Sequence, residues 1–182
     1  MSAFKFLIDT NIVIGLEDTH QVDTGLTELT RRCSAHGVRL FVDGAVDDDI
    51  QRDNDLARRA VTLSKLAKFE RLRGITYPGD ADQARAFGAI NSPNDRSDAR
   101  LLHCLQRRAA DFLITRDTGL QKRAWRAGLG GSVLSVEDAI VWLRQTFEPS
   151  AVDLPYVIER EAYAIDREDE LFDSLRADYP RL

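Results

Sequence analysis

Short, continuous runs of apolar residues alternate with segments of helical periodicity along the first 148 residues. Four runs predict β-strands, at residues 4–9, 38–42, 111–115 and 132–136. None of them alternates apolar with polar positions, which is typical of parallel strands buried on both faces of a sheet. The helical spacing predicts helices at residues 11–16, 24–36, 45–52, 56–73, 80–87, 97–110, 120–126 and 136–147.

This alternation of strands and helices predicts the fold class. Parallel strands need crossover connections, and helices in those connections cover both faces of the sheet. We therefore expect an α/β protein, a three-layer α/β/α sandwich whose central parallel sheet has about four or five strands. The chain has 182 residues and is 43% hydrophobic, which suffices for one good core, placed in a domain of residues 1–148.

Charge separates a C-terminal extension, residues 149–182, from that domain. Residues 151–182 hold nine acidic and four basic side chains, and their net charge of −5 equals that of the whole chain. The extension is therefore acidic, while residues 1–150 are neutral. Its apolar residues among acids fit a docking helix, a connector to another domain, or a solvated end.

Aspartates occupy positions where a surface role explains them poorly. Asp9 and Asp117 end two of the apolar runs, and Asp98 follows Ser97, the expected N-cap of the helix at 97–110. Ligands of open parallel sheets bind beyond the carboxyl ends of the strands, so the fold would bring these carboxylates together. The structural alternatives are a helix-dipole role for Asp98 and a turn or cap role for Asp9.

A fourth acid comes from the run Asp47, Asp48 and Asp49. Successive helical residues point about 100° apart, so the three carboxylates cannot face one cleft together. Val46 and Ile50 mark the buried side, and Asp49 precedes Ile50 at the edge of that side. We expect Asp49 to be the fourth acid, with Asp48 as the rival and a solvated helix start as the alternative to both.

Clustered carboxylates without basic partners beside them in sequence predict a divalent cation, Mg²⁺ or Mn²⁺. Three or four aspartates hold one such ion, or two in the presence of substrate, and the ion activates water against a phosphodiester. The sequence has no GxSxG motif and no histidine with ligand or triad spacing. Arg52, Arg116 and Lys122 are candidate contacts to nucleic acid.

Four segments occur in this order across residues 1 to 147: FLIDTN, the acid before Ile50, NDRSDARLLHCL and DFLITRDTGLQKRA. Together they resemble the PIN (PilT N-terminal) domain of metal-dependent ribonucleases, which includes VapC-type toxins. The resemblance implies a metal site and catalytic centre of Asp9, Asp49, Asp98 and Asp117, supported by Asn11 and Thr115. It also implies hydrolysis of RNA to a 5′-phosphate and a 3′-hydroxyl.

The resemblance has limits within this sequence. The second acid of the family is often Glu, whereas here it is Asp, and residues 56–94 exceed the needs of a minimal toxin. The acidic extension resembles the connector of proteins that fuse a PIN domain to an acetyltransferase domain. A toxin would bind an antitoxin or another regulatory protein, and a homodimer would lengthen the basic groove.

Two other classes of function compete with the ribonuclease. One is a PIN-like module that binds nucleic acid or protein with little catalysis. The other is a metal-dependent phosphatase, although such enzymes place a second carboxylate two residues after the first, where Asn11 stands. No run of 18 apolar residues and no signal segment is present, so we expect a cytoplasmic protein without a membrane partner.

Overall fold

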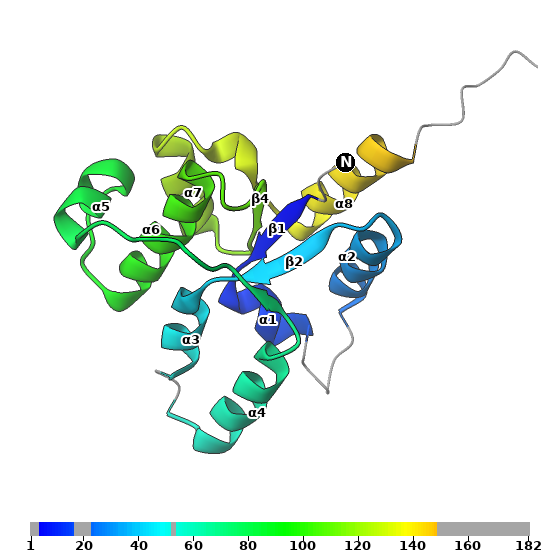
Figure 1. Ribbon diagram of the computed structural model, residues 1–182, viewed down its shortest axis with the longest axis horizontal. Coiled ribbons are helices and arrows are strands. Elements are labelled where there is room, and N and C mark those ends of the chain that lie inside the picture. Colours follow the sequence, from blue (N-terminus) through cyan, green and yellow to red (C-terminus); the bar gives the residue numbers. More distant parts are fainter. Residues whose placement is uncertain (1–3, 17–22, 52–53, 149–182) are drawn as a thin grey trace, which may run out of the picture. The chain divides into compact units, whose positions relative to one another are not determined.

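The computed structural model describes residues 4–16, 23–51 and 54–148 and has the expected α/β architecture (Figure 1). Its five strands are all parallel and lie in the order β3-β2-β1-β4-β5. They are β1 (Lys5–Ile8), β2 (Arg39–Val42), β3 (Glu70–Arg71), β4 (Phe112–Ile114) and β5 (Val133–Leu134). The helices are α1 (Thr10–Leu16), α2 (Thr24–Ala35), α3 (Gly44–Gln51), α4 (Leu56–Leu66), α5 (Asp80–Phe87), α6 (Pro93–Gln106), α7 (Thr118–Arg126) and α8 (Val136–Phe147).

Two hydrophobic cores lie on the two faces of the sheet. Phe6 and Ile8 of β1 pack with residues of α1, α2, α3 and α8, whereas Leu7 packs with residues of α5, α6 and α7. All three β1 side chains are fully buried. The continuous apolar run therefore indicated a strand covered on both faces, and the three-layer prediction is confirmed.

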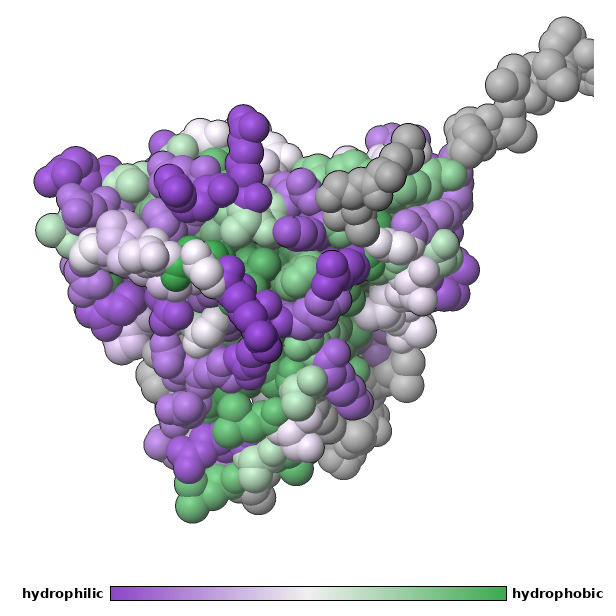
Figure 2. Space-filling view, viewed as in Figure 1, coloured by the Kyte–Doolittle hydropathy of each residue, from purple (hydrophilic) through white to green (hydrophobic). Residues whose placement is uncertain are grey.

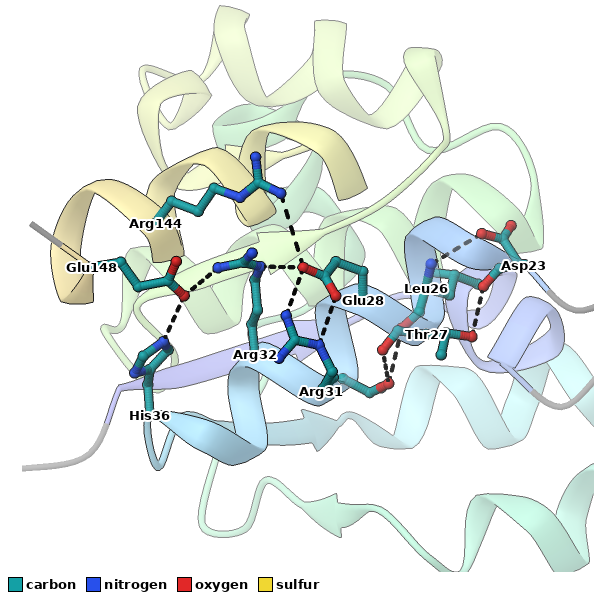
Figure 3. Close-up of polar contacts among 10 residues, drawn as sticks. Asp23, Leu26, Thr27, Glu28, Arg31, Arg32, His36, Arg144 and Glu148 are labelled. Atoms are coloured by element: carbon teal, nitrogen blue, oxygen red, sulfur yellow. Dashed lines mark hydrogen bonds and ion pairs between the residues drawn. The ribbon is translucent and has the colours of Figure 1, made fainter. Parts of the chain in front are cut away.

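Helix α8 is fixed to α2 by a network of charged side chains (Figure 3). Arg32 Nε lies 2.5 Å from Glu28 Oε1 on the same helix, and its Nη1 pairs with Glu148 directly after α8. His36 Nε2 lies 3.1 Å from the same Glu148 oxygen. Hydrogen bonds from Arg31 and Arg32 lower the pKa of the Glu28 carboxyl group to about 2.

The helix predicted at 56–73 is shorter than expected. Helix α4 ends at Leu66, and residues 70–71 form β3, which pairs with β2 through Phe41↔Glu70 and Val42↔Arg71. The basic and apolar residues after Leu66 continue a helical pattern, so the pattern does not predict this strand. A two-residue strand is defined by its neighbour in the sheet and not by its own periodicity.

Other predicted elements are found with boundaries that differ by a few residues. Strand β5 covers only residues 133–134 of the expected 132–136 and follows a 3₁₀ turn at Gly130–Ser132. No helix in the described part of the chain is long and apolar enough to cross a membrane. The acidic extension at 149–182 lies outside the described residues.

Candidate active site

Two neighbouring strand ends bring Asp9 and Thr115 together. Ile8 pairs with Ile114, so the residues that follow leave the sheet side by side. Thr115 Oγ1 donates a hydrogen bond of 2.7 Å to Asp9 Oδ2, and both residues are buried. Asn11 Nδ2 donates to the same oxygen at 2.7 Å, and the Thr10 amide donates to Asp9 Oδ1 at 2.6 Å. These donors fix the orientation of the Asp9 carboxylate.

Asp117 is the N-cap of α7. Its Oδ1 accepts hydrogen bonds from the amides of Gly119 at 2.6 Å and Leu120 at 3.2 Å, which satisfies two of the free donors of the first turn. A Cβ atom at Gly119 would lie 2.9 Å from Asp117 Oδ1, so glycine permits this close cap. The cap uses one carboxylate oxygen and anchors Asp117 beside the end of β4.

Asp98 lies on α6, but not where the sequence placed it. The helix begins at Pro93 and its N-cap is Ser92, whose hydroxyl accepts from the Asp95 amide at 3.1 Å; the expected N-cap at Ser97 is wrong. Proline at the first helical position suits a helix start because it lacks the amide hydrogen that would go unpaired. Asp98 therefore lies in the second turn and not the first.

The environment of Asp98 joins the three acids into one cluster. Its side chain is 22% exposed. Burial raises the pKa of the Asp98 carboxyl group to about 7; the charges of Asp117, Asp9 and Asp95 act in the same direction, and Arg123 opposes them. Asp9, Asp98 and Asp117 come from β1, α6 and α7, so only the tertiary structure places these carboxylates within electrostatic reach of one another.

Arg123 is a residue of this cluster that the sequence did not single out as a site residue. Its Nε lies 3.9 Å from Asp98 Oδ2, and its guanidinium pairs with Asp95 Oδ1 and donates to the Asp95 backbone carbonyl at 3.1 Å. Asp95 also accepts from Ser92 Oγ at 2.8 Å, so it completes the cap of the helix. Arg123 thus ties α7, which carries Asp117, to the start of α6.

The fourth expected acid is less defined. Asp49 lies in α3, but its side chain is outside the described residues. Its neighbours have partners away from the cluster, since Asp47 pairs with Arg71 and Asp48 Oδ2 lies 2.7 Å from Arg100 Nη1. The structure therefore brings three of the four expected acids together and leaves the choice between Asp48 and Asp49 as the sequence left it.

Asp43 is a buried acid that the sequence analysis missed. It is 2% exposed and follows β2 directly, and its Oδ1 accepts from the Ala45 amide at 2.8 Å to start α3. Tyr77 donates its hydroxyl to Asp43 Oδ2, and Arg100 Nη2 lies 3.5 Å from Oδ1. Its position after an apolar run was the same signal that identified Asp9. These partners give Asp43 a structural role between β2, α3 and α6.

Two of the three candidate nucleic-acid contacts can be placed. Arg116 lies between Thr115 and Asp117, is exposed, and pairs with Asp23 at 2.5 Å. Lys122 is exposed on α7. Arg52 lies outside the described residues.

The donor set of the cluster suits a hard divalent cation. Carboxylate oxygens are the ligands that Mg²⁺ and Mn²⁺ prefer, and burial is the main cause of the raised pKa of Asp98, with Asp117, Asp9 and Asp95 acting in the same direction. As the side chains lie, no three His, Cys, Asp or Glu residues of the described ranges form a recognisable metal site. The chemistry of the cluster fits a cation, while its ligands would have to move closer to hold one.

Comparison with known proteins gives no family for this chain, since no protein-family model matches it and no curated protein matches it significantly.

Proposed function

We propose that this protein is a Mg²⁺- or Mn²⁺-dependent endoribonuclease of the PIN type. The observation that carries the proposal is the placement of Asp9 and Asp117 beside two neighbouring strand ends at the carboxyl edge of a parallel sheet, with the partly buried Asp98 close enough for their charges to affect its pKa. Open α/β sheets bind ligands at this edge, and clustered acids there are typical of metal-assisted phosphodiester hydrolysis. The order of the motifs around these acids supports RNA as the substrate.

The residues of the cluster have separate tasks in this reaction. A divalent cation, when bound, supplies an activated water and offsets the charge of the phosphate. Asp9, oriented by Asn11 and Thr115, and Asp117, oriented by the α7 amides, would hold the cation. Asp98, with a pKa of about 7, suits the transfer of the proton that the attacking water loses near neutral pH. Arg116 and Lys122 would contact flanking phosphates.

The direct test is incubation of the pure protein with a mixed RNA pool in Mg²⁺, Mn²⁺ or EDTA, with mapping of the cut ends. We expect cleavage in both metals, none in EDTA, and fragments with 5′-phosphate and 3′-hydroxyl ends. Asp98→Asn should reduce the rate by at least about a hundredfold, because it removes a charge without changing the side-chain volume. Asp82→Asn is the matched control, since Asp82 is 62% exposed on α5 and pairs with Arg85.

A second candidate is a PIN-like binding module with little catalysis. It is favoured by the present positions of the acids, which form no recognisable metal site among the described residues, and by Arg123 beside Asp98. Calorimetric titration with Mn²⁺ separates the two candidates. Saturable binding that Asp98→Asn weakens supports the nuclease, whereas no saturable binding supports the module.

The proposed partners depend on nuclease activity. A regulated toxin would be inhibited by an antitoxin or another protein, and a homodimer would join two basic surfaces. Co-expression with a protein encoded beside it, followed by size-exclusion chromatography, tests both partners.

A further inference from the structure

A cavity lies at the edge of the sheet where β3 pairs with β2. Its volume is about 660 Å³, and its lining comes from β1, from β2, from β3 and from the segments on either side of β3. The lining residues are Lys5, Arg39, Phe41, Ala67, Phe69, Glu70, Arg71 and Arg73. Lys5 precedes Asp9 by four residues, so these two residues lie roughly 13 Å apart along β1, whereas Arg71 pairs with Val42 at the carboxyl end of β2.

The sheet register explains why two of the basic residues lie side by side, whereas Arg71, which pairs with Val42, lies on the other face. Lys5 pairs with Arg39 and Leu7 with Phe41, so these side chains share one face of the sheet. Helices α5, α6 and α7 pack on this face around Leu7, toward β4 and β5. Figure 2 shows hydrophobic side chains next to hydrophilic ones at the centre of the view. At the beginnings of β1 and β2, Arg39 is exposed and Lys5 is partly exposed, whereas Leu7 and Phe41 on the same face are buried.

Two arginines of the cavity are held in place while some of their donors stay free. Arg39 Nε donates to Glu70 Oε1 at 2.8 Å, its Nη2 pairs with the other oxygen, and its guanidinium lies 5.0 Å from the centre of the Phe41 ring. Arg71 uses both terminal nitrogens on Asp47. Carboxylate pairing of this kind orients the guanidinium groups before a ligand arrives.

Lys5 and Arg73 supply the remaining positive charge. The Lys5 ammonium lies 5.9 Å from the Phe41 ring centre. In the described part of the chain, neither Lys5 nor Arg73 has a carboxylate partner for its charged group. The lining has four basic side chains and one acidic side chain, Glu70, and Asp47 pairs with Arg71 from outside the lining. The net charge of these six side chains is +2.

We propose that this cavity binds a small molecule of nucleotide size that carries at least two phosphate groups, such as a nucleoside diphosphate. Fixed arginines with an adjacent lysine are the donors that suit phosphate oxygens, and the excess positive charge disfavours a metal cation. The volume falls within the range of about 300 to 1,000 Å³ typical of small-molecule sites. This site does not depend on the proposed nuclease activity.

Isothermal titration of the full chain with ADP, pyrophosphate and adenosine, in EDTA and low salt, tests the proposal. We expect saturable binding of ADP and pyrophosphate and binding of adenosine at least about tenfold weaker than that of ADP. Lys5→Gln and Arg73→Gln should each weaken ADP binding by about tenfold, because each removes one charge-assisted contact. The two variants are made separately, and circular dichroism verifies that each is folded.

Two control variants locate the binding. Arg85→Gln removes a base that is 80% exposed on α5, and Asp98→Asn alters the acid cluster; both should bind ADP with wild-type affinity. Lack of saturable ADP and pyrophosphate binding would overturn the proposal, as would unchanged affinity in both the Lys5 and Arg73 variants. A third result would also overturn the proposal: a twelve-nucleotide single-stranded RNA binds, the same variants weaken its binding, and ADP does not bind. The basic residues would then contact the phosphate backbone of RNA.

Discussion

The raised pKa of Asp98 predicts that the cluster destabilises the folded protein at neutral pH in the absence of metal. The pKa rises from 3.8 to about 7, so the folded state binds the proton more tightly than the unfolded state does. The stability that protonated Asp98 contributes is fully present below pH 3.8 and is lost as the pH rises through about 7. Asp98→Asn should therefore stabilise the protein, and more strongly at high pH.

The magnitude follows from the size of the shift. One pKa unit corresponds to about 1.4 kcal/mol, so the penalty has an upper limit on the order of 4 kcal/mol at pH 8 and about 2 kcal/mol at pH 5. Asparagine must also be desolvated, so only part of this is recovered. The stability gained by Asp98→Asn at pH 8 is therefore compared with the stability gained at pH 5. We expect the gain to be roughly 1 to 2 kcal/mol larger at pH 8.

Urea unfolding in EDTA at pH 5 and pH 8 measures this gain, with Asp82→Asn as the matched control. We expect the control to stay within about 0.5 kcal/mol of wild type at both pH values. Adding Mn²⁺ should stabilise the wild type and leave Asp98→Asn less affected, because the cation would favour the ionised form of the buried Asp98 carboxyl group. An equal change in stability at both pH values, or destabilisation by Asp98→Asn at pH 8, would refute the electrostatic argument.

Three further predictions test other parts of the molecule. Asp43→Ala should destabilise the protein by about 2 to 4 kcal/mol in urea unfolding, because it leaves the Tyr77 hydroxyl and the Ala45 amide without their acceptor; Asp43→Asn, which keeps an acceptor oxygen, should cost less. Thr115→Val removes a buried donor to Asp9 and should weaken Mn²⁺ binding by about tenfold to a hundredfold in calorimetry, while an unchanged affinity would show that the hydroxyl does not orient the site. Glu28, whose pKa is lowered to about 2 by its arginine partners, contributes stability that is present above its ordinary pKa of 4.5 and is lost as the pH falls toward 2. Glu28→Gln should therefore lose less thermal stability than the wild type between pH 4.5 and pH 2. The same fall in melting temperature in both proteins over this range would contradict the prediction.

Periodicity determined most of the fold. The apolar runs at 4–9 and 111–115 predicted buried parallel strands, because side chains on both faces of such strands face helices and must all be apolar. Periodicity did not predict β3, because its two residues form a strand only by pairing with the edge of β2. The start of α6 was also misplaced, since Ser92 and Pro93 carried a stronger helix-start signal than Ser97.

The sequence by itself determined which acids stand at strand ends, because hydrophobic runs stop where the chain leaves the core. Asp9 and Asp117 were found in this way, and Asp43 carried the same signal. Only the tertiary structure decided which of these carboxylates share a cluster. Asp43 is satisfied by Tyr77 and the α3 amide, whereas Asp98 is brought to Asp9 and Asp117 by the packing of α6. Charge interactions depend on distance and burial, and neither quantity is written in the order of residues.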